Sequence, residues 1–327
     1  AWGARGYPGG MVPETGRLHS IWFRDNDRTL FDSEPDTLRE IAANLAFGRR
    51  AMGAGEGRIR PMMAAHATDT QTPETMRALR TAARELGTGL HMHIAQRPTE
   101  TEAVRRLWSK TPVQWMEELG LFDGPVFGAH MRALDWTVDP AILNKHAAVY
   151  VHCPSAAGAG GATQPYPEAL AAGMNVNIGI DTHSNDYLEN LKLAVIGGRA
   201  RARILSELCD VPVRHPTVLE AIDGATRVAA SGLGRDDLGR IAEGARADFA
   251  TIDVSGLFFG TGSLPPEPLN NLLYCNGLAV RNVATDGRFQ VFDGRLMVAD
   301  QDTVRAKGDA VVRKLWRQLA DEDWFST

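Results

Sequence analysis

Between residues 36 and 230, short apolar runs typical of buried strands alternate with longer amphipathic runs typical of helices. Strands are expected at 58–65, 89–96, 125–129, 147–152 and 174–180, and helices at 36–54, 73–86, 100–109, 113–119, 140–145, 167–172, 186–205 and 216–230. Alternation at this spacing indicates parallel βαβ units, because a helix is the usual connection between neighbouring parallel strands. The sequence therefore predicts an α/β fold built on a parallel sheet.

The pattern changes after residue 240. A short strand is expected at 249–254, and residues 280–298 alternate apolar and polar side chains around Asp286-Gly287 and Asp293-Gly294. Such dipeptides favour tight hairpin turns, so this part predicts a small antiparallel sheet. The expected units are an α/β part at 1–240, an antiparallel sheet portion at 241–300 and a closing C-terminal helix at 301–327.

Composition excludes several classes of protein. A formal net charge of −5 argues against a nucleic-acid-binding surface. No apolar run reaches the roughly 18 to 20 residues needed to span a membrane, and residues 1–15 lack the pattern of a signal peptide. The three cysteines are widely spaced and form no CxxC pair, which is typical of a reducing compartment. We expect a cytoplasmic protein that binds neither nucleic acid nor membranes.

Polar side chains gather where the expected strands end. His91 and His93 lie on one face of their strand, because side chains alternate along a strand. His93, His130 and Asp181 each stand at or near the carboxyl end of a strand, which in a (β/α) barrel is the catalytic face. An HxH pair by itself fits either a metal or catalytic site or two ordinary, partly buried histidines.

Five motifs in order resemble the amidohydrolase superfamily, specifically its chlorohydrolase and aminohydrolase branch (atrazine chlorohydrolase-like and cytosine deaminase-like enzymes). They are HMHIAQ at 91–96, PVQWMEELGLFDGPVFGAH at 112–130, YVHCPSA at 150–156, PEALAAGMNVNIGIDT at 167–182 and DDLGRIAEGARADFATIDV at 236–254. The resemblance implies a (β/α)₈ TIM-type barrel with a β-sandwich built from both chain ends. It also implies one divalent metal at the barrel mouth, Zn²⁺ or else Fe²⁺.

The same resemblance assigns site residues. His93 matches the metal ligand on barrel strand five, and His130 matches the strand-six histidine that binds metal or orients water and substrate. Asp181 matches the strand-eight aspartate, a metal ligand and general base. Imidazole and carboxylate groups suit both metals, and a metal lowers the pKa of a water molecule so that it can attack an electron-poor carbon. Asp181 and His130 are thus the expected catalytic residues, and His93, His130 and Asp181 the expected metal ligands.

Other polar residues keep two interpretations each. His66 ends a strand and either contacts substrate or is structural, and His183 lies either at the pocket rim or on the surface. For His91 we expect a role in core packing or in support of the site, and for Cys153 that of a buried structural thiol.

Gln96 is a departure from the family, which usually has glutamate at this position. An amide cannot transfer a proton at neutral pH, although it can hydrogen-bond a substrate. This favours a reaction in which Asp181 alone manages the protons, or else a protein that has lost activity.

The second departure concerns length. The family's first strand carries an HxH pair of metal ligands, yet only 92 residues precede His93 and none of them forms another HxH. The chain therefore resembles the C-terminal two-thirds of a member, with barrel strands about three to eight inside residues 1–240. A barrel lacking strands has open edges and is poorly stable alone. A second chain could carry the missing part, or this chain could be part of a longer polypeptide; both are preferred over a degenerate, metal-free relative.

We expect a metal-dependent hydrolase that acts on a C–N bond, or a C–Cl bond, of a small heterocyclic or amide-like molecule. The alternatives are hydrolysis of a linear amide or urea-type bond, and a non-catalytic subunit that stabilises a partner chain. The expected partners are a small-molecule substrate and further copies in a homo-oligomer, together with a second chain that bears the HxH ligands if the missing part is a separate polypeptide. The loops expected to set specificity include 2–32, 156–164 and 257–271, and Ala156 and Ala157 hint at an apolar or small substrate.

Overall fold

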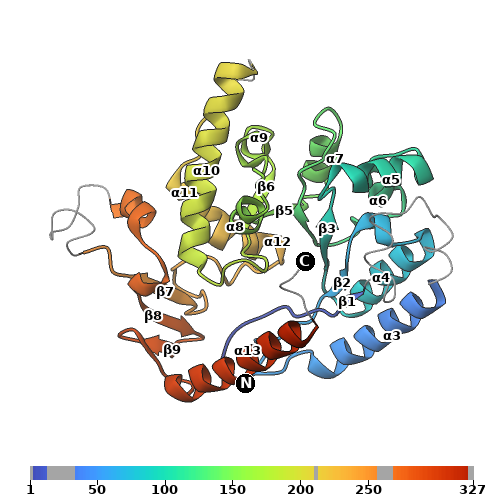
Figure 1. Cartoon of the computed structure of the whole chain (residues 1–327). Coiled ribbons are helices and arrows are strands. Elements are labelled where there is room, and N and C mark those ends of the chain that lie inside the picture. Colours follow the sequence, from blue (N-terminus) through green and yellow to red (C-terminus); the bar gives the residue numbers. More distant parts are fainter. Residues whose placement is uncertain (1–2, 13–33, 210–212, 256–267, 323–327) are drawn as a thin grey trace.

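The computed structural model describes residues 3–12, 34–209, 213–255 and 268–322, and Figure 1 gives its course. Six parallel strands form one sheet in the order of the sequence. They are β1 (Met11–Val12), β2 (Met63–Ala65), β3 (Leu90–Ile94), β4 (Val126–His130), β5 (Val149–His152) and β6 (Asn175–Ile178). Six strands in series are what barrel strands three to eight require, and the α/β prediction is confirmed.

Helices connect these strands, as the alternation predicted. The helices are α3 (Glu34–Ala51), α4 (Pro73–Glu85), α5 (Pro98–Trp108), α6 (Pro112–Glu118), α7 (Asp139–Lys145), α8 (Pro154–Ala159), α9 (Tyr166–Ala171), α10 (Tyr187–Leu208), α11 (Val218–Asp223) and α12 (Ala229–Gly232), with short 3-10 turns η1 (Thr68–Thr70), η4 (Pro268–Tyr274) and η5 (Gly277–Ala279). Figure 1 shows α3 and α4 beside β1–β3, and α9, α10 and α11 beside β6. None of the helices in the described ranges is long and apolar enough to cross a membrane.

Local chemistry explains where α4 begins and ends. The Thr72 side chain accepts a hydrogen bond from the Thr75 amide, and Pro73 takes the first helical position, where its missing N–H costs nothing. Gly87 follows the helix with φ 64°, a conformation that favours glycine. The apolar face of α4 packs into the main core through Met76 and Leu79. The predicted helix 73–86 is therefore confirmed almost to the residue.

Two expected elements differ from the prediction. The helix expected at 216–230 is divided, because a π-helical turn, η2 (Gly224–Val228), separates α11 from α12. At Gly224 a Cβ atom would stand 2.6 Å from the carbonyl oxygen of Val176, so the backbones approach closely there. The strand expected at 58–65 is shorter, because residues 58–62 pair instead with residues 6–8 of the N-terminal segment.

The N-terminal segment was expected to be loop, but residues 11–12 form the edge strand β1, and Val12 is fully buried. Gly9 lies over the inside of the sheet, where a Cβ atom would stand 2.8 Å from Nε2 of His91. Most of the loop expected at 2–32 lies outside the described residues, as does most of the loop 257–271.

The second sheet is antiparallel, in the order β10 (Arg295–Leu296), β9 (Arg288–Phe292), β8 (Val280–Thr285) and β7 (Phe249–Ile252). Both predicted hairpin turns form, with positive φ at Asp286-Gly287 and at Asp293-Gly294. The last helix, α13 (Gln301–Asp321), has no buried side chain among its residues. The domain limits at 240 and 300 stay predictions.

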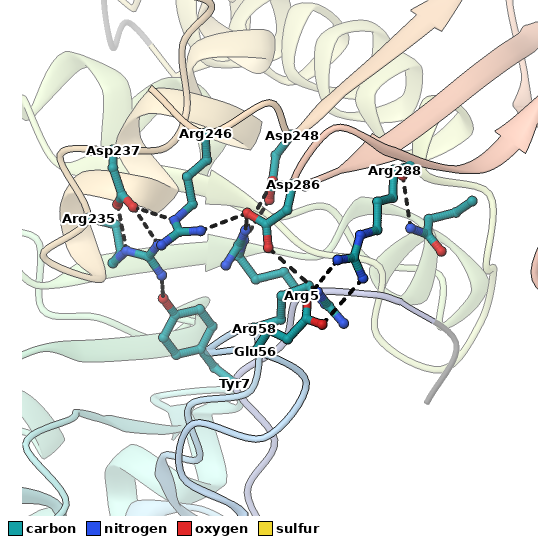
Figure 2. Close-up of polar contacts among 11 residues, drawn as sticks. Arg5, Tyr7, Glu56, Arg58, Arg235, Asp237, Arg246, Asp248, Asp286 and Arg288 are labelled. Atoms are coloured by element: carbon teal, nitrogen blue, oxygen red, sulfur yellow. Dashed lines mark hydrogen bonds and ion pairs between the residues drawn. The ribbon is translucent and has the colours of Figure 1, made fainter. Parts of the chain in front are cut away.

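An ion-pair cluster joins the N-terminal segment to this second sheet (Figure 2). Nε of Arg5 lies 2.6 Å from Oδ2 of Asp248, and its Nη2 lies 2.6 Å from Oδ1 of Asp286. Beside it, Arg235 binds Asp237 and donates a hydrogen bond to the hydroxyl of Tyr7. The same segment that adds β1 to the barrel sheet thus also holds the small sheet in place.

Candidate functional site

A cavity of about 250 Å³ opens at the carboxyl ends of the parallel strands. The residues that line it are Gln96, Arg97, His130, Arg132, Ala156, Ala157, Gly160, Gln164 and Asp181. His130 ends β4, and the others come from the segments that follow β3, β4, β5 and β6. The structure therefore brings three of the predicted site residues, Gln96, His130 and Asp181, to one cavity on the expected face.

His130 and Asp181 face each other across this cavity, with Nε2 of His130 3.6 Å from Oδ2 of Asp181. Both residues have backbone torsions in the left-handed region, at φ 74° and 57°, as does Ala95 after β3 at φ 48°. Such torsions are uncommon outside glycine and cluster at functional sites, where the surrounding structure enforces them. The strand ends therefore turn sharply and aim these side chains into the cavity.

His93 lies beside His130, with the two rings stacked at a centroid distance of 5.2 Å. Nδ1 of His93 donates a hydrogen bond to the carbonyl oxygen of His66, which can only accept. A neutral His93 consequently keeps a lone pair on Nε2, the arrangement typical of a metal-binding histidine. The ring of His66 makes an edge contact with the ring of His93, a predicted metal ligand, at a centroid distance of 5.1 Å. His66 is not among the residues that line the cavity.

Gln164, which the sequence did not single out, fixes the tautomer of His130. Its Oε1 accepts the amide N–H of Cys153 at 2.9 Å, so its Nε2 is the donor to the carbonyl of Cys153 and to Nδ1 of His130 at 3.3 Å. A neutral His130 then carries its proton on Nε2, the atom that faces Asp181. In this arrangement His130 donates a hydrogen bond toward the carboxylate. The loop before α9 has no periodic pattern that could have revealed Gln164.

Burial keeps three imidazoles at or beside the site neutral, those of His66, His130 and His152. Desolvation, helped by the nearby His93, lowers the pKa of His130 to about 4. The negative charge of Asp181 acts in the opposite direction and offsets part of this lowering. Desolvation likewise lowers the pKa of His66 to about 4, helped by the charges of His93 and Arg97. His152 is fully enclosed, and its pKa is also lowered to about 4. At neutral pH these three imidazoles are therefore available as hydrogen-bond partners.

Gln96 is held by a buried carboxylate. Oε2 of Glu100 accepts the Gln96 amide N–H at 2.7 Å, while Oε1 accepts those of Ala95 at 3.0 Å and Thr68 at 3.3 Å. The side-chain Oε1 of Gln96 is buried and has no hydrogen-bond partner in the described structure. Because a buried unpaired acceptor is costly, this oxygen is suited to accept a hydrogen bond from a ligand.

Two arginines of the cavity, Arg97 and Arg132, were also missed. They follow β3 and β4, and Nε of Arg132 donates a hydrogen bond to the carbonyl oxygen of Gln96 at 2.8 Å. Burial and the nearby charge of Arg97 lower the pKa of Arg132. Their places directly after two site-bearing strands were the signal in the sequence that could have found them.

His183 is exposed on the turn after β6 and does not line the cavity. His91 is largely enclosed beneath Gly9, and its Nε2 has no partner in the described structure. Cys153 is buried, and burial raises its thiol pKa to about 12.

The donor groups at this site include types that divalent metal ions prefer. The ligand atoms of His130, Cys153 and Asp181 all lie within 4.8 Å of one another, and His93 adds an imidazole through its contact with His130. Imidazole and carboxylate donors fit Zn²⁺ or Fe²⁺, whereas a thiol kept protonated by burial is a poor ligand. His93 and Asp181 thus fit a divalent metal, whereas His130, with its proton on Nε2 and its Nδ1 accepting from Gln164, offers no lone pair in this arrangement. The predicted roles of single residues stay predictions.

Comparisons with known proteins agree on one family. The profile of the Amidohydrolase family matches residues 5–288. A 5-methylthioadenosine/S-adenosylhomocysteine deaminase of Desulfitobacterium hafniense is 32% identical over 291 residues, which make up 86% of this chain and 65% of the relative. Its counterpart from Moorella thermoacetica is 32% identical over 302 residues, 91% of this chain and 67% of the relative. The chain thus spans about 65% of the length of such curated relatives and matches their C-terminal part.

Solved structures share the fold. An adenosine deaminase from Xanthomonas campestris with bound zinc superposes with a TM-score of 0.73 at 20% identity, over 97% of this chain and 66% of that one. The zinc complex of atrazine chlorohydrolase from Arthrobacter aurescens gives 0.71 at 22% identity, over 83% and 60%. The predicted resemblance is confirmed, and this chain belongs to the amidohydrolase family.

Proposed function

We propose that the chain forms the larger part of a metal-dependent hydrolase that cleaves a C–N bond, or a C–Cl bond, of a small heterocyclic or amide-like molecule. The observation that carries this proposal is the cavity in which His130 faces Asp181 at 3.6 Å, with His93 stacked on His130. The relatives support the same chemistry, since they include deaminases and a chlorohydrolase.

In this proposal His93 and Asp181 hold one divalent cation, for which zinc is the first choice, while His130 takes the orienting one of its two predicted roles. Bound there, the cation supplies Lewis-acid chemistry that makes water a nucleophile near neutral pH. The Asp181 carboxylate accepts the proton of the attacking water and passes it toward the leaving group. Nε2–H of His130 donates a hydrogen bond that keeps this carboxylate in place, and the buried Oε1 of Gln96 accepts one from an N–H group of the substrate.

A further part of the proposal concerns polypeptide outside this chain. Relatives are about a third longer, and among the described residues β1 pairs only with β2, and β6 only with β5. Parallel strands with an open edge need a neighbour. We therefore propose that another segment, continuous with this chain or on a second chain, completes the barrel and adds metal donors. A homo-oligomer and a cytoplasmic location stay predictions.

Metal analysis tests the proposal. The purified assembly, with any partner polypeptide, is expected to hold about one zinc or iron per complete site, and to release ammonia or chloride from aminated or chlorinated heterocycles. 5-Methylthioadenosine is the first substrate to try, given the names of the relatives. His93→Ala should remove the metal, whereas His215→Ala, at an exposed position outside the cavity, should leave it bound. An assembly without stoichiometric metal would contradict the hydrolase proposal and favour a non-catalytic subunit.

A further inference from the structure

We propose that a second cavity, between α8 and α10, binds a small neutral molecule with an apolar body and one hydrogen-bond donor. The two helices lie side by side (Figure 1), and the cavity has a volume of about 140 Å³. It shares Ala157 and Gln164 with the larger cavity that contains His130 and Asp181, and its other lining residues are different ones. The inference concerns a site of its own and does not rest on the proposed function.

His152 supplies the recognition group. The residue is only 4% exposed and lines the cavity, and Tyr166 stacks on one face of its ring at a centroid distance of 4.7 Å. Nδ1 of His152 donates a hydrogen bond to Oε1 of Gln164 at 2.7 Å, because this oxygen already accepts the amide N–H of Cys153.

A neutral His152 therefore has a lone pair on Nε2. Within the described residues no hydrogen bond reaches this atom, since both hydrogen bonds of the ring involve Nδ1. A buried acceptor without a partner is costly, so Nε2 is suited to accept an O–H or N–H group of a ligand.

The other polar groups of the cavity are in use. The side-chain amide of Gln164 bonds with His130, His152 and the backbone of Cys153. The hydroxyl oxygen of Thr163 accepts a hydrogen bond from Nη1 of Arg201 at 2.8 Å. The remaining lining residues are apolar or glycine.

Size and chemistry together define the ligand. An apolar cavity of roughly 150 Å³ holds one benzene ring. No acidic or basic side chain other than the neutral His152 lines this cavity, so a charged ligand would lose its hydration without compensation. The best fit is consequently a neutral molecule of about the size of one six-membered ring, with a hydroxyl or N–H group that faces His152.

The wall formed by α10 leaves room at a cost in helix stability. Gly197 and Gly198 lie in the interior of this helix, where glycine is less favourable than alanine. Packing explains Gly198, because a Cβ atom there would lie 2.8 Å from Cγ of Pro216. At Gly197, by contrast, a Cβ atom would meet nothing within 4 Å in the described structure. Leu193 lies one turn earlier on the same helix face and also lines the cavity, so a side chain at position 197 would extend toward it.

Phenol and toluene, titrated separately into the full EDTA-treated chain, test this site. The two molecules are nearly equal in size, but only phenol has a donor. Labelling with ¹⁵N-histidine makes Nε2 of His152 visible by NMR, and this resonance follows occupancy. We expect phenol to bind about threefold more tightly than toluene or better, because it forms one additional hydrogen bond. The Nε2 resonance should take the shift of a hydrogen-bonded nitrogen with phenol alone.

Two variants separate the cavity from its recognition group. Gly197→Leu should fill the cavity and weaken both probes about tenfold or more. Gly308→Leu is the matched control, because it places the same side chain within α13, where a Cβ atom also meets nothing within 4 Å in the described structure. It should leave both affinities unchanged. His152→Phe keeps a ring for stacking but removes the acceptor, so phenol and toluene should then bind alike.

Four outcomes would overturn the site. They are binding of neither probe, no preference of the wild-type chain for phenol, equal phenol binding by wild type and Gly197→Leu, and loss of phenol binding in Asp181→Asn. The last variant changes the larger cavity alone, so such a loss would place phenol there. Circular dichroism checks the fold of every variant. Because the measurement needs neither metal nor turnover, its failure would leave the hydrolase proposal untouched.

Discussion

His130 and Asp181 face each other at 3.6 Å from the ends of two strands, and both do so with a left-handed backbone. A non-glycine residue in this region costs free energy, of the order of 1 to 3 kcal/mol. Two such residues in one cavity indicate that the fold maintains this arrangement against local preference. The facing pair is therefore the part of the site on which a mechanism most depends.

Asp181→Asn should abolish turnover and preserve the fold. The amide keeps the size of the side chain and tolerates positive φ, but it cannot accept the proton of water. We expect the kcat of the complete assembly to fall about 10³-fold or more, with an unchanged Tm to within a few degrees. Asp123→Asn, at an exposed aspartate that pairs with Arg84, is the control. Turnover at the wild-type rate in the Asp181→Asn variant would show that Asp181 is not the general base.

Gln96→Glu should introduce a group that can transfer protons at a place where the substrate lies. Oε1 of Gln96 is buried at the cavity without a partner, so a carboxyl group there would point at the ligand. We expect ammonia release from aminopurine nucleosides to rise at least tenfold. Gln96→Met keeps the volume but offers no proton, and should show no gain. Equal rates in both variants would show that position 96 does not limit proton transfer.

Glu100→Ala should destabilise the site more than a typical surface change. The Glu100 carboxylate is buried and accepts the amide N–H groups of Thr68, Ala95 and Gln96, so its loss leaves three buried donors unpaired. We expect a loss of about 3 kcal/mol in the free energy of unfolding, measured with urea. Glu102→Ala, at an exposed position on the same helix, should cost less than about 0.5 kcal/mol.

Much of the fold was predictable because periodicity reports burial. The strands at 89–96, 125–129 and 147–152 are apolar runs, and each occurs in the structure within a few residues of its expected limits. β1 could not be predicted, because two residues are too few to show a period and its partner lies far along the chain. The hairpins at Asp286-Gly287 and Asp293-Gly294 were predictable from turn chemistry alone.

The site was predictable only where a motif marks a strand end. His93, His130 and Asp181 belong to such motifs, and the structure brings them near one another. Gln164 and Arg132 lie in connecting segments, whose course depends on packing between distant parts of the chain. Hydrophobic patterns carry no information on such contacts, so these residues required the three-dimensional arrangement.

Arg5→Gln should loosen the connection between the N-terminal segment and the small sheet. The Arg5 side chain is only 9% exposed and binds both Asp248 and Asp286. Its removal leaves the partly buried Asp248 carboxylate without its cation, while Asp286 keeps Arg246 at 2.9 Å. Breaking such a pair costs about 3 kcal/mol in the free energy of unfolding. Arg288→Gln breaks the pair with Glu56, where the side chains are 67% and 64% exposed, and should cost less than about 1 kcal/mol. Equal losses would contradict a structural role for Arg5.

The buried histidines predict a loss of stability in acid. Burial lowers the pKa of His152 in the folded chain to about 4, while an unfolded histidine titrates near 6.5. Between these values the unfolded chain binds one more proton, so the free energy of unfolding rises with pH from 4 to 6.5. His66 and His130 act in the same direction. The Asp69 carboxyl opposes them, because burial and the charge of Glu100 raise its pKa to about 7.

His152→Gln isolates one of these contributions. The free energy of unfolding of the EDTA-treated chain is to be measured with urea at several pH values between 4.5 and 6.5. Each proton bound on unfolding adds about 1.4 kcal/mol per pH unit to the slope, so the slope of the variant should be smaller by about this amount. His215→Gln changes an exposed histidine and should keep the wild-type slope. A slope unchanged by His152→Gln would mean that this imidazole takes up no proton on unfolding.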